Sequence, residues 1–173
     1  MNTHRDAPSL ARWHHYSQEK VPARRYRRAQ GGLPLIRVLH VVSDFRFGGA
    51  ERVAANLLRT LDPEQFDVGA ICLRGPFGSD LEEILAKDGI PVWYMGKERG
   101  FDPLVLARVT RTMEHFRPQV VHTHSYALRY AFPYMLGRRI PAMVHTVHNL
   151  AEMETEKAGA LKSPGPLRAS ASR

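Results

Sequence analysis

The sequence alternates between two hydrophobic patterns, and this alternation limits the folds open to the chain. Short apolar runs rich in β-branched residues occur at 36–42, 66–73, 91–95, 119–123 and 141–147. Runs of this length and composition are typical of strands that are buried in a parallel sheet. Between them lie longer segments whose apolar residues recur every three or four positions, as they do in an amphipathic helix.

Signals for helix ends accompany this periodicity. Ser79 and Glu82 have the spacing of a capping box at the start of one segment. Asp102 precedes Pro103, which is an N-cap residue followed by proline at the first helical position. Glu82 and Glu83 are interpreted as part of a solvated helix face. Strands that alternate with helices in this way predict an α/β fold, a doubly wound, Rossmann-like parallel sheet. If the strand order is 3-2-1-4-5, the loops after the first and fourth strands flank the point where the order reverses.

The composition changes at both ends of this alternating core. Residues 1–34 hold seven Lys or Arg against two acidic residues, a net charge of +5 within the total of +8. We interpret 1–34 as a basic, disordered leader, 35–156 as the folded domain, and 157–173 as a disordered tail rich in Ala, Ser and Pro. Because most of the positive charge lies in the leader, the folded part is not expected to bind nucleic acid specifically.

The cysteine count and the hydropathy indicate a reducing, cytoplasmic environment. The single cysteine, Cys72, excludes a disulfide framework within the chain and a multi-cysteine zinc site. No apolar run approaches the ~20 residues of a membrane-spanning helix, and 1–34 lacks the apolar segment of a secretory signal. The helix expected over 126–136 mixes aromatic residues with Arg129. That mixture fits either packing on the sheet or peripheral contact with the inner face of a membrane.

The loop after the first strand is a candidate ligand site. In open α/β sheets, ligands bind beyond the carboxyl ends of the strands, near the point where the strand order reverses. Gly48 and Gly49 stand where this loop gives way to a helix. Such glycines are expected to adopt backbone conformations that other residues resist, and the first amides of a helix favour an anion. The loop is neither a dinucleotide fingerprint nor a P-loop. A tight turn without a ligand explains the two glycines equally well.

Histidines form a second candidate site. His122, His124, His145 and His148 lie in or just after the fourth and fifth strands. His122 and His124 are two residues apart and share one face of a strand, which for His122 favours a role within the sheet. His124 and His148 stand at carboxyl ends of strands, where a functional and a structural role are equally compatible with the sequence. A zinc site is one interpretation, but no carboxylate pattern accompanies the histidines, so no metal is expected.

Four segments, taken in order, resemble the N-terminal domain of family 4 glycosyltransferases, which have the GT-B fold. They are 36–42 (IRVLHVV), 48–52 (GGAER), 120–125 (VVHTHS) and 144–148 (VHTVH), and the resemblance covers about residues 35–156. It implies retaining transfer of a sugar, such as a hexose, from a nucleotide-sugar donor. The acceptor would be a sugar, a lipid or a polysaccharide, and no metal or other cofactor would be needed.

The resemblance also implies roles for individual residues. His148 would lie close to the transferred sugar as the catalytic residue. The loop beside the donor phosphates and the acceptor would comprise Gly48, Gly49, Ala50 and Glu51. The acceptor itself would contact Arg46, His124 and Ser125.

The family's second domain, which holds the donor, has no recognisable counterpart in 151–173. Three explanations compete: a truncated or frameshifted gene product, a split enzyme whose donor half is a separate chain, and a stand-alone binding domain. The change of composition after Lys157 favours the first. The resemblance therefore predicts an acceptor-binding half that is inactive alone. The alternatives are a non-catalytic interaction module or the acceptor-binding subunit of a split enzyme and, third, a protein that binds nucleic acid through its basic leader.

Overall fold

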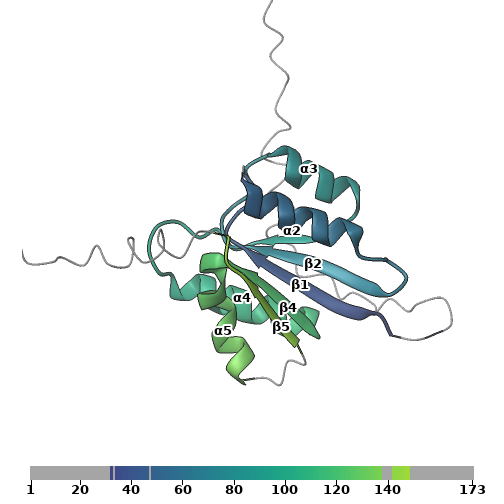
Figure 1. The fold of residues 1–173 in the computed structure, drawn as a ribbon. Coiled ribbons are helices and arrows are strands. Elements are labelled where there is room, and N and C mark those ends of the chain that lie inside the picture. Colours follow the sequence, from purple (N-terminus) through teal and green to yellow (C-terminus); the bar gives the residue numbers. More distant parts are fainter. Residues whose placement is uncertain (1–31, 33, 47, 138–141, 149–173) are drawn as a thin grey trace, which may run out of the picture.

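A parallel sheet organises the part of the chain that the computed structural model describes, which comprises residues 32, 34–46, 48–137 and 142–148 (Figure 1). Its strands are β1 (Ile36–Val42), β2 (Phe66–Cys72), β3 (Val92–Tyr94), β4 (Val120–His124) and β5 (Ala142–Thr146). They lie in the order β3-β2-β1-β4-β5 and all neighbours are parallel, which confirms the predicted fold class and gives the strand order that the sequence left conditional. The expected leader, apart from residues 32 and 34, and the expected tail lie outside the described residues.

Helices cover both faces of the sheet. They are α2 (Gly49–Thr60), α3 (Asp80–Lys87), α4 (Pro103–Phe116) and α5 (Leu128–Gly137), with a short 3-10 helix, η1 (Ser125–Ala127), before α5. Figure 1 shows α2 and α3 on one side of the strands and α4 and α5 on the other. Each pair closes its own apolar core against the sheet. One core includes Leu39, Val109 and Met113, and the other includes Ala54, Leu58 and Cys72.

The predicted helix starts are confirmed by their hydrogen bonds. The Ser79 side chain accepts from the amide of Glu82, and Oδ1 of Asp102 accepts from the amide of Leu104 at 2.8 Å. Each bond satisfies one of the amides that a helix leaves without a partner at its N-terminus. These caps fix where α3 and α4 begin, and therefore how long the preceding loops at the sheet edge are.

Glu82 is not solvated, which corrects one expectation from the sequence. Its side chain is buried, and Oε2 accepts from the amides of Phe77, Gly78 and Ser79 at 3.0, 2.6 and 3.1 Å. A carboxylate that accepts several amide bonds tolerates burial, because the lost hydration is replaced. Its neighbour Glu83 stays near the surface in an ion pair with Lys87.

Cys72, the last residue of β2, is buried in one of the two cores. Its side chain has no exposed surface, and it packs in the core beneath α2 and α3. Burial raises the pKa of the Cys72 thiol well above its usual range. This cysteine is therefore a small core residue in its ground state and not a nucleophile.

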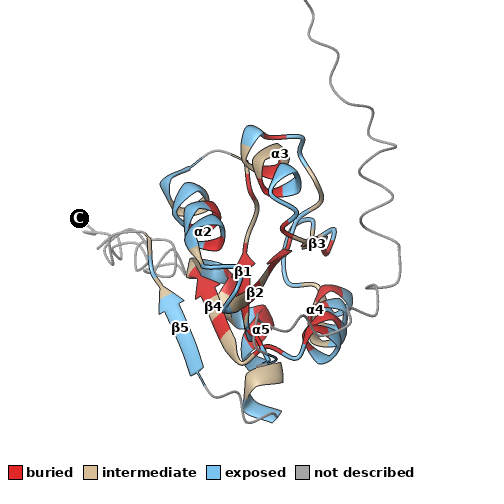
Figure 2. Ribbon diagram, turned by 90° about the vertical axis from the view of Figure 1, so that its right-hand side faces the viewer, coloured by how far each residue is buried: buried red, intermediate tan, exposed pale blue. Residues whose placement is uncertain are grey.

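The sheet becomes more exposed toward β5. Figure 2 shows the central strands buried and β5 exposed along its length. Strand pairing places His40 of β1 opposite His122 of β4, and His124 opposite Thr146 of β5. His40 and His122 therefore lie side by side on neighbouring strands, and His124 follows at the carboxyl end of β4. Among the described residues, no helix has the length and apolar character needed to cross a membrane.

Candidate functional site

A pocket of about 220 Å³ opens at the carboxyl ends of β1 and β4, where the strand order reverses. Its walls come from the β1–α2 loop, the first turn of α2, the start of η1 and the residue two positions beyond β5. The lining residues are Val42, Ser43, Ala50, Glu51, His124, Ser125, Tyr126 and His148. This position is the one at which open α/β sheets bind their ligands.

The pocket gathers five of the residues that the family resemblance singled out. These residues are Ala50, Glu51, His124, Ser125 and His148. The first four lie within one helical turn of a strand end or a helix start, and His148 lies beyond the end of β5. Gly48 and Gly49 stand next to the pocket at the start of α2 without lining it. Arg46 does not line this pocket; it lines a second and more basic pocket formed by the loops after β1, β2 and β3.

The two glycines differ from our expectation about the backbone. Gly48 has φ 169° and ψ 163°, an extended conformation open to any residue, and Gly49 is already helical. The absence of a side chain is what matters at Gly48, because a Cβ atom there would collide with the carboxylate of Glu51. At Gly49 the space a Cβ atom would occupy is empty. The turn therefore leaves room for Glu51 on one side and for an approaching molecule on the other.

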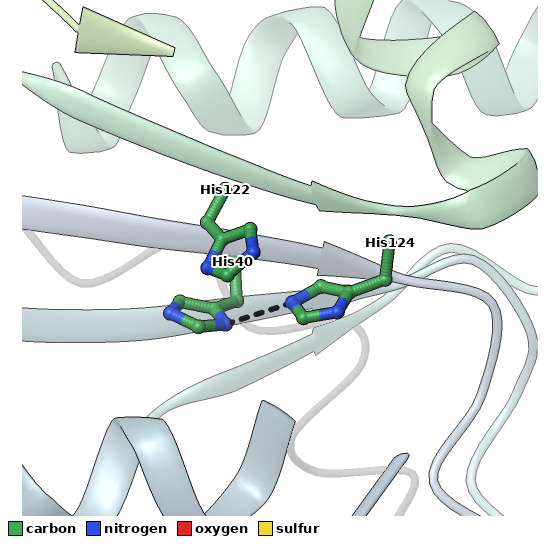
Figure 3. A group of neighbouring side chains, drawn as sticks. All are labelled: His40, His122 and His124. Atoms are coloured by element: carbon green, nitrogen blue, oxygen red, sulfur yellow. Dashed lines mark hydrogen bonds between the residues drawn. The ribbon is translucent and has the colours of Figure 1, made fainter. Parts of the chain in front are cut away.

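A chain of hydrogen-bonded histidines runs from the core to the pocket. Nδ1 of His40 lies 3.1 Å from Nε2 of His124, and Nδ1 of His124 lies 2.8 Å from Nε2 of His148. Figure 3 shows the first of these contacts, with the ring of His122 beside it. The backbone amide of His148 also donates to Oγ of Ser125 at 3.3 Å. The position of the His148 ring is therefore held from β1 and β4 together.

Two further side-chain contacts hold β5 to β4 on either side of this chain. Nε2 of His122 lies 2.8 Å from Oγ1 of Thr146, and Oγ1 of Thr123 lies 2.9 Å from Nδ1 of His145. His122 thus has the structural role within the sheet that its position favoured. His145 is on the opposite face of β5 from Thr146, the partner of His122, and it does not line the pocket.

The environment keeps the inner histidines uncharged. Burial, together with the neighbouring His122 and His124, lowers the pKa of His40 to about 3. Burial, His122 and His148 lower the pKa of His124 to about 3. The pKa of His122 is lowered in the same way, first by burial. At neutral pH each of these rings therefore carries a single N–H group.

A single N–H group on each ring makes the chain directional. If Nδ1–H of His40 donates to His124, then Nδ1–H of His124 donates to Nε2 of His148, whose own proton must sit on Nδ1. If Nε2–H of His124 donates to His40 instead, Nε2–H of His148 donates inward and its Nδ1 becomes an acceptor. The tautomer of buried His40 therefore decides whether His148 presents a donor or an acceptor to a ligand.

The same cluster has the composition of a metal site, but its geometry fits hydrogen bonding better. One nitrogen each from His40, His122 and His124 lies within 4.8 Å of the others. However, the rings of His122 and His124 are stacked, with centroids 4.2 Å apart and planes 26° from parallel. Imidazole binds a metal through a lone pair in the ring plane, and stacked rings do not aim their lone pairs at a common point.

His40 is the member of the site that sequence reasoning missed. The histidines after β4 and β5 were recognised by their strand ends, whereas His40 lies inside β1 and looks like a core position. The strand order of the sheet places β1 beside β4. The His-x-His pattern of β4 next to a histidine in β1 is the signal that would have found it.

Comparisons with known proteins agree on one family. The model of the family described as Glycosyltransferase Family 4 matches residues 47–172. A UDP-Gal:alpha-D-GlcNAc-diphosphoundecaprenol alpha-1,3-galactosyltransferase of Escherichia coli is 27% identical over 129 residues, which are 70% of this chain and 32% of the relative. The chain thus spans about a third of the length of that relative. The pocket residues from Ala50 to His148 all fall within the family match.

Proposed function

This chain belongs to glycosyltransferase family 4, and from that membership we propose that its pocket binds the reacting end of a sugar acceptor during transfer from a nucleotide sugar. The observation that carries the proposal is the convergence of His148, Glu51 and the start of α2 on one pocket at the switch point of the sheet. Sugar hydroxyls need directed donors and acceptors, and these groups supply both.

The proposed reaction makes one bond and breaks one. An acceptor hydroxyl oxygen bonds to the anomeric carbon of the donor, and the bond from that carbon to the nucleoside diphosphate breaks, with retention of configuration. The hydroxyl proton passes to the departing diphosphate. Negative charge grows on this leaving group, and the unpaired amides at the start of α2 are placed to stabilise it. No metal or other cofactor is invoked.

His148 is the proposed catalytic residue. Its Nε2 is engaged with His124, which leaves Nδ1 for the acceptor hydroxyl or the transferred sugar. Held by His124 and Ser125, the ring loses little freedom on binding, which is how a site gains from preorganisation. Glu51, beside Gly48, is placed to accept hydrogen bonds from sugar hydroxyls.

We further propose that the described domain forms one wall of the active cleft and that a donor-binding domain forms the other. The relative is about three times as long as the segment it shares with this chain, since the match covers 32% of it. A cleft closed from two sides excludes water, which would otherwise hydrolyse the donor. Residues 1–173 alone are therefore proposed to bind acceptor and to be inactive in transfer, with the donor wall supplied by further sequence or by a separate chain.

The relative suggests the class of substrates. Its name specifies a UDP-galactose donor and an acceptor sugar carried on diphosphoundecaprenol. We propose a hexose donor and a lipid-linked acceptor for this chain as well, with action at the inner face of a membrane through peripheral contact. Exposed Phe132 and Leu136 on α5, 44% and 73% exposed, with Arg129 near them in sequence, support such contact.

Acceptor binding by the full chain tests the proposal. We expect a short-chain lipid analogue of an α-GlcNAc diphosphate to perturb the NMR signals of His148 and Ser125, and His148→Ala to weaken binding by about tenfold. His115→Ala, on α4 and outside the pocket, is the matched control and should leave affinity unchanged. Equal affinity in both variants, or robust transfer by residues 1–173 with no partner present, contradicts the proposal.

A further inference from the structure

A second pocket, of about 490 Å³, lies next to the pocket lined by His124 and His148, which we call the histidine pocket, and the two share no lining residue. We call the second pocket the basic pocket. Three loops at the carboxyl edge of the sheet form it: the one after β1, the one after β2 and the one after β3. Its charged and aromatic lining comprises Asp44, Arg46, Arg74, Phe77, Lys97, Glu98 and Arg99. The family resemblance did not distinguish this pocket from the reacting site.

The walls of the basic pocket are built into the fold. The loop after β2 is held by buried Glu82, which accepts the amides of Phe77, Gly78 and Ser79. Oγ of Ser79 in turn donates to the carbonyl oxygen of Phe45, which ties this loop to the one after β1. A pocket whose walls are already fixed loses little entropy when it binds a ligand.

The charge of the basic pocket favours an anion. Four Lys or Arg side chains and two acidic ones line it, which leaves a formal charge of +2. Asp44 lies between two of the arginines, 3.0 Å from Nη2 of Arg46 and 3.6 Å from Nε of Arg74. Each guanidinium has five N–H donors, so most of them are left for a ligand after this contact. Paired guanidinium groups of this kind suit phosphate oxygens.

The basic pocket adjoins the histidine pocket. Ser43 lines one and Asp44, the next residue, lines the other. Lys97 of the basic pocket also lies over the ring of Tyr126, with Nζ 5.3 Å from the centroid, and Tyr126 lines the histidine pocket. A ligand whose sugar meets His148 can therefore place a neighbouring charged group among Arg46 and Arg74.

Exposed apolar side chains accompany the cations. Phe77 is 61% exposed in the wall of the basic pocket, and Cζ of Arg46 lies 5.1 Å from its ring centroid. Phe101 and Leu104, 58% and 66% exposed, follow Arg99 closely in the chain. Exposed apolar groups beside a cationic pocket suit a ligand that joins a phosphate to a hydrocarbon tail more than they suit a nucleotide.

We infer that the basic pocket binds the diphosphate of a lipid-linked acceptor, with the acceptor sugar in the histidine pocket and the lipid leaving over Phe77 and Phe101. Only the sugar end of this assignment rests on the proposed function. The diphosphate end rests on Arg46, Arg74 and Lys97 themselves. The donor nucleotide is the other source of a diphosphate, and the experiment separates the two.

The test measures binding to the full chain by isothermal calorimetry, with inorganic pyrophosphate, farnesyl diphosphate and UDP as probes. We expect farnesyl diphosphate to bind more tightly than pyrophosphate, and Arg74→Gln to weaken both by about tenfold. Phe77→Ser should weaken farnesyl diphosphate and leave pyrophosphate unchanged. Arg111→Gln, an exposed arginine on α4, is the matched control and should bind as the wild type does.

Each outcome decides the inference. Equal losses in Arg74→Gln and Arg111→Gln would show only general attraction to a basic protein, and would overturn it. A loss of UDP affinity in Arg74→Gln as large as the loss of farnesyl diphosphate affinity would assign the pocket to the donor, and would also overturn it. Thermal unfolding of each variant confirms that it folds. If pyrophosphate binding depends on Arg74 while His148→Ala leaves sugar binding intact, the basic pocket stands and the proposed function fails.

Discussion

Nδ1 of His124 and Nε2 of His148 lie 2.8 Å apart, and this contact joins the last residue of β4 to a residue two positions beyond β5. Because His124 also contacts His40, the ring that faces the ligand is connected to one that is 2% exposed. The chemistry offered in the pocket thus depends on a residue that no ligand touches.

Replacing His40 should therefore change His148 from a distance. In His40→Leu, Nε2 of His124 loses its partner in a buried position, and we expect the free energy of unfolding to fall by about 1–3 kcal/mol. The nitrogen-15 chemical shifts of the His148 ring should show a changed ratio of tautomers. His145→Leu removes the contact with Thr123 but leaves the hydrogen bonds among His40, His124 and His148 intact, so it should keep the wild-type ratio of His148 tautomers. An unchanged ratio in His40→Leu would contradict the directional chain.

Stability should decline in mild acid. The pKa values of His40 and His124 are lowered from 6.5 to about 3 in the folded protein, so below pH 6.5 the unfolded chain binds protons that the folded one does not. The stabilisation is complete above pH 6.5 and is lost as the pH falls toward 3, by up to about 1.4 kcal/mol per pH unit for each histidine. Urea unfolding between pH 7 and pH 5 measures this slope. The slope should be shallower in His40→Leu than in the wild type. Equal slopes in the two proteins would contradict a lowered pKa of His40 in the folded state.

Replacing Glu82 or its neighbour Glu83 by glutamine should lower the free energy of unfolding by very different amounts. Glu82→Gln weakens three amide contacts of a buried carboxylate, and we expect a loss of about 1–3 kcal/mol in the free energy of unfolding. Glu83→Gln removes only an exposed helical ion pair with Lys87, which contributes about 0.2–0.5 kcal/mol. Urea denaturation of both variants measures the contrast. Similar losses would mean that the loop amides do not depend on Glu82.

The two glycines at the start of α2 should also behave differently. In Gly48→Ala the new methyl group must displace the carboxylate of Glu51, so we expect altered signals for the pocket residues and weaker acceptor binding. In Gly49→Ala the methyl group meets open space at the first position of α2, so we expect the free energy of unfolding and the acceptor affinity to stay close to those of the wild type. Thermal unfolding and acceptor titration distinguish them. A Gly48→Ala variant with wild-type affinity would show that Glu51 does not need its present position.

The fold was predictable because its determinants are local. Apolar runs, caps and the proline after Asp102 each depend on a few consecutive residues, and the structure confirms the elements they predicted. Contacts between residues of different strands were harder to predict from the sequence. The contact of His40 with His124 depends on which strands pair and in what register, and the burial of Glu82 depends on amides that a loop turns inward.

Arg46 shows the limit most clearly. The family resemblance grouped it with His124 and Ser125 as a contact of the acceptor. In the structure Arg46 pairs with Asp44 and lines the basic pocket, whereas His124 and Ser125 line the histidine pocket. The direction in which a loop side chain points depends on the residues it contacts in the folded protein, and the local sequence pattern does not specify these contacts.

Because the thiol of Cys72 is buried, its chemical labelling can be used to measure opening of the folded protein. The sequence contains one cysteine, and it lies in β2 with no exposed surface. An alkylating reagent can reach that sulfur only when the core around Cys72 opens, so the labelling rate measures how often this core opens. A ligand that binds the closed sheet must slow this labelling in proportion to its occupancy. Mass spectrometry of the unmodified chain can thus detect acceptor binding without a probe attached to the protein.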